Sequence, residues 1–362
     1  MGIRGVPASH GGFETFAEQL ALYLMQRGWE VTVYCQTDGG GQLHDDIWCG
    51  VRRIHIPVSG QGPAGTVVFD WKATLHAIRE TELCLTLGYN TAVFGVVLRA
   101  FGVPNVMNMD GIEWARAKWG RIAKIWFYLN DWAGCWLGNH LVADHPEIGK
   151  HLMSRVREGK ITMIPYGADP VESASEDAVA ALGLQPGRYL TLIARPEPEN
   201  SILEIVRAFS RRPRGYDLAV LGNYDADRQP YHRSVMSCAS KEVKFLGAIY
   251  QKDVVQALRF HSALYVHGHQ VGGTNPSLVE ALGASCPVLA HDNRFNRWVA
   301  GNSARYFADE AECADQLDEI LNSEDLRASM RAGSRRRFRE AFTWPDVLKQ
   351  YEELLTRFAA AR

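Results

Sequence analysis

The residues best suited to chemistry in the second half of the chain lie in two polar stretches that each follow a predicted buried strand. Arg195 ends one of these strands and opens the sequence Arg-Pro-Glu-Pro-Glu-Asn. A guanidinium at that place can hold phosphate oxygens through paired hydrogen bonds. A surface ion pair with Glu197 or Glu199 is the alternative. We therefore predict an anion site at Arg195.

The other stretch joins a strand ending at Val266 to a helix that begins at Pro276, and its loop is polar and rich in glycine. Proline is favoured in a first helical turn. Backbone N–H groups from Gly272 to Asn275 would face a diphosphate at this positive helix end. Glu280 lies one turn further on, on an otherwise apolar face. A buried carboxylate needs partners, and ribose hydroxyls are good ones; a solvent-facing Glu280 is the alternative.

Two carboxylates and a glycine-rich turn are the candidates in the first half. Asp110 and Glu113 follow a predicted strand, where a carboxylate can orient a hydroxyl or accept its proton. Asp110 could instead cap the next helix. Gly11 and Gly12 lead into a helix with Glu14 in its first turn, so its unpaired N–H groups can bind an anion or a sugar hydroxyl; a simple tight turn is the alternative. The glycine spacing is not Gly-x-Gly-x-x-Gly, so a nicotinamide dinucleotide is unsupported.

The stretch from Arg116 to Trp136 mixes cations with Trp, Tyr and Phe. On a helix, this mixture is typical of contact with a lipid surface, because cations bind headgroups and aromatic rings lie at the boundary. A core helix with a cationic outer face would look similar. The residues that we predict to contact a membrane are Arg116, Lys118, Trp119, Arg121 and Lys124.

Short apolar strands alternating with amphipathic helices must position these residues. In the first half we predict strands over 30–35, 51–56, 83–87, 103–109 and 141–143, and helices over 14–27, 67–80 and 92–101, with a further helix start at 145–146. In the second half we predict strands over 189–194, 217–221, 243–246, 263–266 and 287–290, and helices over 201–209, 254–260 and 276–282.

This alternation predicts an α/β protein with two facing, doubly wound Rossmann-like domains. Ligands of such sheets bind beyond the carboxyl ends of the strands, so we expect the site in an interdomain cleft. We divide the chain into 1–167, 168–343 and a C-terminal helical segment, 344–362, that packs back on the N-terminal domain. The glycine-rich loop begins at the first residue, so the strand expected before it is missing or truncated.

The composition of the 362 residues, with 46% hydrophobic and 22% charged, is that of a folded globular protein. A net charge of −2 gives no basic field for nucleic acid. The seven Cys have no metal-ligand spacing, and their odd number argues against a disulfide framework, which favours a reducing cytoplasm. The sequence shows neither a signal peptide nor a membrane-spanning run.

With these motifs the sequence resembles the retaining GT-B glycosyltransferases of family 4, and more closely their bacterial rhamnosyltransferase-like branch, whose N-terminal domain is of the DUF1972 type. The resemblance covers nearly the whole chain and rests on four stretches in the expected order: 4–14, 110–114, 195–200 and 267–277. It implies that a sugar, L-rhamnose from dTDP-L-rhamnose, is moved to a lipid-linked saccharide in cell-surface polysaccharide synthesis. It also implies an enzyme without metal or cofactor, at the inner face of the cytoplasmic membrane.

The same resemblance implies a role for each matched residue. Arg195 steadies the leaving diphosphate, Glu280 holds the ribose, and Asp110 contacts the transferred sugar or the acceptor, so Asp110 and Arg195 form the catalytic set. The implied donor-binding residues are Gly11, Gly12, Arg195, Asn200, His267, Gly272, Gly273, Thr274, Asn275 and Glu280. The implied acceptor-side residues are Glu14, Asp110 and Glu113.

The sequence departs from common family 4 members at three places, one of which is Asp110, where many relatives have a His. Gly272 stands where a second Glu commonly precedes Glu280 by eight residues, and Asn200 stands where a Lys usually follows the phosphate-binding Arg. His267 or His269 would then compensate for the missing positive charge. Two alternatives to a transferase remain: a nucleotide-sugar 2-epimerase, and a non-catalytic sugar-nucleotide-binding protein of an assembly complex.

Overall fold

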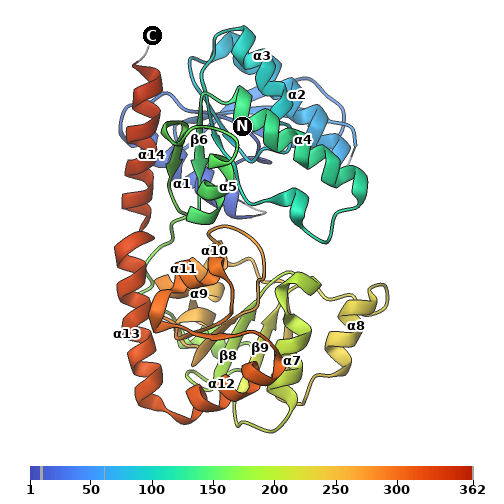
Figure 1. The fold of residues 1–362 in the computed structure, drawn as a ribbon, viewed down its shortest axis with the longest axis vertical. Helices are drawn as coiled ribbons and strands as arrows, with labels where there is room; N and C mark the ends of the chain where they lie inside the picture. The colour runs from blue at the N-terminus through green and yellow to red at the C-terminus, as the bar shows by residue number, and fades with distance from the viewer. Residues whose placement is uncertain (9–10, 61, 361–362) are drawn as a thin grey trace. The chain divides into compact units, whose positions relative to one another are not determined.

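The computed structural model describes residues 1–8, 11–60 and 62–360. The chain forms two compact units (Figure 1). The first contains Met1–Tyr166 together with the C-terminal helix from Trp344, and the second is Gly167–Thr343.

The first unit contains parallel strands with helices between them. Its helices are α1 (Gly12–Gln26), α2 (Pro63–Glu80), α3 (Gly95–Ala100), α4 (Arg121–Leu137), α5 (Pro146–Met153) and α14 (Trp344–Ala359), with 3₁₀ helices η1 (Ala92–Phe94), η2 (Glu113–Ala115) and η3 (Glu158–Lys160). Its strands are β1 (Thr32–Asp38), β2 (His44–Trp48), β3 (Val51–Val58), β4 (Cys84–Leu87), β5 (Asn105–Asn108), β6 (His140–Ala143) and β7 (Ile161–Met163).

These strands form two sheets rather than the single doubly wound sheet that we expected. One has the order β4-β5-β6-β7 and the other β1-β3-β2. The main chain of the first four residues lies between them. The Met1 amine donates to the Leu85 carbonyl at 2.8 Å, the Leu87 N–H donates to the Met1 carbonyl at 3.0 Å, and the Gln36 N–H donates to the Arg4 carbonyl at 2.8 Å. This segment occupies the place of the strand that the sequence led us to expect before the glycine-rich loop.

The hairpin β2–β3 was missed in the sequence because β2 is polar and almost fully exposed. Its antiparallel pairing follows from the turn Cys49-Gly50, in which both residues have positive φ, 49° and 85°. Two such residues form the tight turn whose twist matches that of a hairpin. A turn of two residues leaves no room for the helix that a parallel connection needs.

The second unit is a parallel six-stranded sheet with helices between its strands. Its strands are β8 (Tyr189–Ile193), β9 (Asp217–Leu221), β10 (Val243–Gly247), β11 (Leu264–His267), β12 (Val288–His291) and β13 (Arg305–Phe307). Its helices are α6 (Glu176–Ala180), α7 (Ile202–Ser210), α8 (Pro230–Ser237), α9 (Lys252–Phe260), α10 (Pro276–Gly283), α11 (Arg294–Ala300), α12 (Glu310–Asn322) and α13 (Glu324–Ala341), with 3₁₀ helices η4 (Pro198–Asn200) and η5 (Gly301–Ser303).

The core of the second unit lies on both faces of this sheet. Alternate residues of a strand point to opposite faces. Leu190 and Leu192 of β8 therefore pack with α7 and α12, whereas Tyr189 packs with α6 and α9. A sheet buried on both faces has near-continuous apolar strands, as the sequence shows.

The C-terminal helix α14 is anchored in the first unit by side chains of α1 and β5. The rings of Phe16 and Tyr351 lie 4.6 Å apart, and the Asn108 amide donates to the Tyr351 hydroxyl at 2.8 Å. The Tyr23 hydroxyl donates to the Glu352 carboxylate at 2.9 Å. Helix α14 therefore supports the end of β5, two residues before Asp110.

Candidate functional site

The strand order of the second unit creates a switch point between β8 and β11. The sheet has the order β10-β9-β8-β11-β12-β13, so the chain winds outward in one direction from β8 and in the other from β11. Ligands of such sheets bind outside the carboxyl ends of the strands at this point. Arg195 follows β8, and the polar stretch 268–275 follows β11. The fold therefore brings the two predicted stretches to one place.

Close contacts join these two loops. A Cβ atom added to Gly268 would lie 2.1 Å from the Asn200 carbonyl oxygen, so only glycine fits there. The Gln270 N–H donates to the Glu199 carbonyl at 2.9 Å, and the Gln270 amide donates to the Ser201 hydroxyl at 2.9 Å. The loops after β8 and β11 thus form one packed surface at the switch point.

The Arg195 side chain is exposed on this surface. The structure gives its guanidinium no ion pair with any residue of the described ranges, and the predicted alternative with Glu197 or Glu199 does not form. The buried amide of Asn200 donates to the Arg195 carbonyl at 2.8 Å. Asn200 therefore fixes the main chain of the loop and leaves the guanidinium available to an anion.

The polar loop ends at the N-terminus of α10, as we predicted. The Asn275 side chain accepts a hydrogen bond from the Ser277 N–H at 3.1 Å, which caps the helix, and Pro276 occupies its first turn. Gly272 has a φ of 141°, a conformation that favours glycine. Thr274 is buried. The cap satisfies one N–H group of α10, so an anion here would be bound by the loop as much as by the helix.

Glu280 is half-buried and paired with Arg259, a residue that the sequence analysis missed. The carboxylate lies 2.5 Å from the Arg259 guanidinium, which is itself buried and also donates to the Ser277 hydroxyl at 3.2 Å. The Tyr265 hydroxyl lies 2.6 Å from the same Ser277 oxygen. A lone arginine in the apolar sequence Ala-Leu-Arg-Phe of α9 was the available signal.

Of the two histidines proposed to compensate for the missing positive charge, His267 lies in surroundings that disfavour a charge. Its ring is buried, neither nitrogen has a hydrogen-bond partner among the described residues, and it stacks on His269 with ring centroids 4.4 Å apart. Burial, together with the nearby His269 and His291, holds the pKa of His267 well below its usual value. This environment disfavours the charged form of His267.

In the first unit, Asp110 follows β5 in a left-handed conformation with a φ of 53°. Its N–H donates to the Asn108 side-chain oxygen at 3.0 Å. Burial, and then the negative charge of Glu113, raise the pKa of the Asp110 carboxyl to about 6. The alternative role as a helix cap is wrong, because η2 receives no side-chain cap. A carboxyl that titrates near pH 6 is suited to proton transfer.

Glu113 lies three residues after Asp110, and its carboxylate is bound by side chains of the loop that follows it. Its carboxylate accepts from the Arg116 guanidinium at 2.7 Å and from the Trp119 indole N–H at 2.9 Å, and Lys118 lies 3.9 Å away. These three cationic and aromatic residues were predicted to lie on the basic helix. Helix α4 instead begins at Arg121, after Gly120.

The glycine-rich turn is described on both sides of Ser9 and His10, which lie outside the described residues. Helix α1 begins at Gly12 with Gly11 before it in extended backbone. The Glu14 carboxylate accepts from the Arg4 N–H at 3.4 Å. A Cβ atom on Gly2 would lie 2.3 Å from the Leu87 carbonyl oxygen, so this glycine permits close packing on β4.

Two family descriptions match consecutive parts of the chain. Residues 1–169 match the family described as domain of unknown function DUF1972, and residues 200–353 match the family described as glycosyl transferase-like. No curated protein sequence matches the chain.

Solved structures with the same fold cover nearly the whole chain. Sucrose-phosphate synthase of Thermosynechococcus elongatus has a TM-score of 0.81 at 18% identity, with 99% of this chain and 98% of that chain covered. Anabaena HepE in complex with UDP-glucose has a TM-score of 0.77 at 15% identity, with 96% of this chain and 97% of that chain covered. Trehalose 6-phosphate synthase of Burkholderia multivorans has a TM-score of 0.75 at 12% identity, with 98% of this chain and 95% of that chain covered.

The chain has a GT-B-like fold, in which residues 1–169 are similar to the DUF1972 domain and residues 200–353 are similar to the glycosyl transferase-like family. Asp110 and the glycine-rich turn lie in the part of the chain that matches DUF1972, and the loop after β11 with Glu280 lies in the part that matches the glycosyl transferase-like family. Arg195 lies just before the matched part of that domain. In the described part of both domains, no three His, Cys, Asp or Glu side chains gather as a metal-binding group.

Proposed function

We propose that this protein is a retaining glycosyltransferase that moves L-rhamnose from dTDP-L-rhamnose to a lipid-linked saccharide during bacterial cell-surface polysaccharide synthesis. The observation that carries the proposal is the exposed Arg195 guanidinium beside the glycine-rich loop at the switch point of the second sheet. The nucleotide-sugar class is further supported by the match to a glycosyltransferase family. Rhamnose and the lipid-linked acceptor rest on the resemblance of the four motifs.

In this proposal the donor binds to the second unit. Arg195 and the N–H groups of Gly272, Gly273 and Thr274 hold the diphosphate, and their positive potential stabilises the charge that develops as the sugar leaves. Asn275 and His267 line the same loop, and Asn200 positions Arg195. Glu280, held by Arg259, accepts hydrogen bonds from the ribose hydroxyls. These groups supply the positive potential that a metal ion provides in other transferases, so we propose that the reaction needs no metal.

The acceptor is assigned to the first unit in this proposal. Asp110 orients the acceptor hydroxyl or the transferred sugar and accepts a proton in its ionised form. Glu14, at the start of α1 with Gly11 and Gly12, contributes hydrogen bonds to sugar hydroxyls. Glu113 acts indirectly, because its contacts to Arg116 and Trp119 hold the loop that carries Asp110.

Binding of several nucleotide sugars by the purified chain, followed by product analysis without an acceptor, tests this proposal. We expect dTDP-L-rhamnose to bind more tightly than UDP-glucose and to remain unchanged when no acceptor is present. A changed nucleotide sugar would show a 2-epimerase instead. If donor binds but no sugar is transferred once lipid-linked saccharides are added, the protein is non-catalytic. If no donor binds, the transferase, the epimerase and the non-catalytic binding protein are all contradicted.

A further inference from the structure

A stripe of large apolar side chains is exposed along α4 and takes no part in the sites described above. The exposed fractions are 87% for Ile122, 61% for Ile125, 59% for Leu129 and 62% for Trp136. Trp126 lies on the same stripe. These spacings keep one side of the helix apolar over its whole length. In water, such a side would normally be covered by another element.

Further large apolar side chains are exposed on the elements that pack beside α4. Helices α3 and η1 pack against α4, and α2 packs against α3 (Figure 1). The rings of Trp71 and Phe94 join α2 to η1 with centroids 5.1 Å apart. We call this surface the α4 face; its further exposed apolar residues are Val68, Trp71, Leu75, Val93, Val96 and Phe101.

The two units differ in how much apolar surface they expose. All residues of the second unit are described, and among its large apolar side chains only Met236 and Tyr250 are exposed. Contiguous apolar patches on a folded protein mark interaction sites. The α4 face is therefore a local feature of the first unit rather than a general property of the surface.

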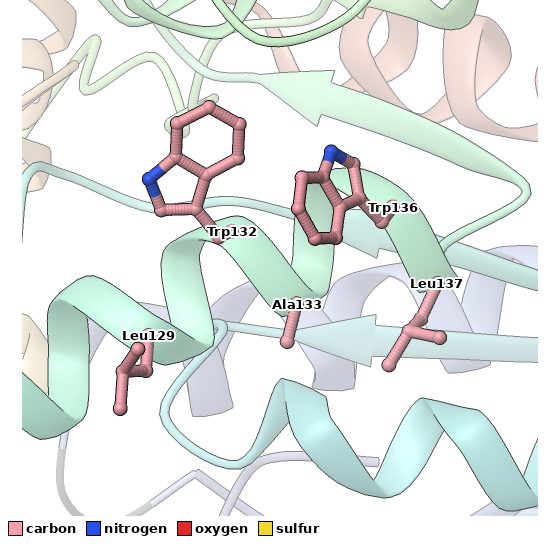
Figure 2. Close-up of a pocket in the computed structure, with 5 residues that line it drawn as sticks. All are labelled: Leu129, Trp132, Ala133, Trp136 and Leu137. Atoms are coloured by element: carbon pink, nitrogen blue, oxygen red, sulfur yellow. The ribbon is translucent and has the colours of Figure 1, made fainter.

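A groove on α4 belongs to this face. Figure 2 shows Trp132 and Trp136 side by side, with Leu129, Ala133 and Leu137 along the same helix. These five side chains line a space of about 450 Å³ that contains almost no polar surface. The rings of Trp132 and Trp136 lie 5.2 Å apart. Such a groove is suited to hydrocarbon rather than to a polar ligand.

Cations lie at both ends of α4. Arg121 and Lys124 lie in its first turn. At the other end, the exposed Arg99 side chain donates to the Trp136 carbonyl at 3.1 Å, and Lys160 donates to the Cys135 carbonyl at 2.7 Å.

Acids are absent from the exposed part of η1, α3 and α4. Asp131 is the sole acidic residue of η1, α3 and α4. It is buried and bound to Arg155 and His151, at 2.9 Å in each case. The α4 face therefore carries positive charge without exposed carboxylates on these three elements.

We propose that the α4 face binds to the surface of a lipid bilayer that contains anionic lipids. Its Trp, Ile and Leu side chains enter the headgroup boundary while its cations bind the headgroups. A second copy of this chain fits less well, because two such faces would bring like charges together. No helix of the described residues is long and apolar enough to cross a membrane. Membrane binding itself does not depend on the proposed function. Only its role, which is to bring the enzyme to a lipid-linked acceptor, rests on that function.

This surface differs from the one that we predicted from the sequence. Arg116, Lys118 and Trp119 are held by Glu113, whereas Arg121 and Lys124 lie in the first turn of α4, at one end of the apolar stripe. The main contribution to binding is now assigned to apolar residues of α4.

Sedimentation of the full chain with lipid vesicles tests the proposal without donor or acceptor, so its failure is distinct from failure of the proposed function. We expect binding to vesicles of equal parts phosphatidylglycerol and phosphatidylcholine and weak binding to phosphatidylcholine alone. Ile122→Ser and Leu129→Ser should each lower the partition coefficient about tenfold. Ile47→Ser is the matched control, because Ile47 is 67% exposed on β2, and it should leave binding unchanged.

Arg121→Gln and Lys124→Gln test the charge contribution. Each should weaken binding to the anionic vesicles about fivefold and leave binding to phosphatidylcholine unchanged. Unchanged circular dichroism would show that the variants are folded. Absence of vesicle binding by the parent chain, equal loss in Ile47→Ser, or a stable dimer that buries the α4 face would overturn the proposal.

Discussion

Arg195 is the residue from which the donor site is argued, because its guanidinium is exposed while its main chain is fixed by Asn200. Arg195→Ala should weaken nucleotide-sugar binding about 10- to 100-fold, since hydrogen bonds to charged groups are each worth about 1.5–3 kcal/mol. Isothermal titration calorimetry measures the change. Arg228→Ala is the control, because its side chain is 86% exposed on the same unit. An equal loss of nucleotide-sugar affinity in both variants would show that the overall positive charge of the unit, and not a site at Arg195, attracts the donor.

Arg259 provides a second test of the donor site, because its buried guanidinium is paired with Glu280. Arg259→Met should lower donor affinity about tenfold and lower the free energy of unfolding by about 3 kcal/mol, since it leaves Glu280 without its partner. Glu280→Gln should weaken donor binding with a smaller loss of stability. Calorimetry and urea unfolding separate the two effects. Full donor affinity in both variants would exclude Glu280 from the ribose site.

Asp110 links the proposed chemistry to pH. Its carboxyl has a pKa raised to about 6, and the ionised form accepts the proton, so turnover should rise as pH increases through about 6 and then level off. Asp110→Asn should reduce turnover strongly with little change in donor affinity. A pH–rate profile of both proteins is the measurement. The assigned role is wrong if Asp110→Asn retains turnover.

The same raised pKa of Asp110 predicts that the stability of the protein falls as pH rises, whereas its turnover increases. Between the unfolded value near 4 and the folded value near 6, the folded protein binds more protons, so stability falls as pH rises through this range. Asp110→Asn removes this penalty and should raise the free energy of unfolding at pH 7 by about 1–2 kcal/mol. Urea unfolding at pH 4 and at pH 7 shows whether the gain appears only at the higher pH.

At the scale of elements, the contact between the loops after β8 and β11 holds the candidate donor site together. Gly268→Ala places a Cβ atom against the Asn200 carbonyl, so we expect a loss of about 2 kcal/mol in stability and weaker donor binding. Gly159→Ala is the control, because no atom lies within 4 Å of its added Cβ. Donor affinity unchanged in Gly268→Ala would show that the two loops act independently.

The sequence predicted these elements well where local patterns decide them. The loop from Gly272 to Asn275 and the helix start at Pro276 follow from glycine, polar residues and proline in order. The hairpin β2–β3 was missed because polar, exposed β2 has no apolar periodicity. Arg259 was missed because its partner Glu280 is distant in sequence, and spacing carries no information about a contact formed by tertiary packing.

For the whole molecule, alternating strands and helices correctly predicted two α/β units, including the parallel sheet of the second. The division of the first unit into two sheets was not predicted, because periodicity indicates strands but not which strands pair. The composition also gave no indication of the exposed apolar residues of the α4 face. A net charge of −2 says nothing of where charges lie, and only the folded structure shows which apolar residues remain uncovered.

Transfer of the sugar itself is the most direct test of the proposed function. The full chain is incubated with dTDP-L-rhamnose and lipid-linked saccharides from bacterial membranes, with a chelator present, and products are analysed by mass spectrometry. We predict an acceptor heavier by one deoxyhexose, equimolar release of dTDP, and loss of product in Arg195→Ala. An unmodified acceptor with every nucleotide sugar supplied would contradict the assignment of this protein as a glycosyltransferase.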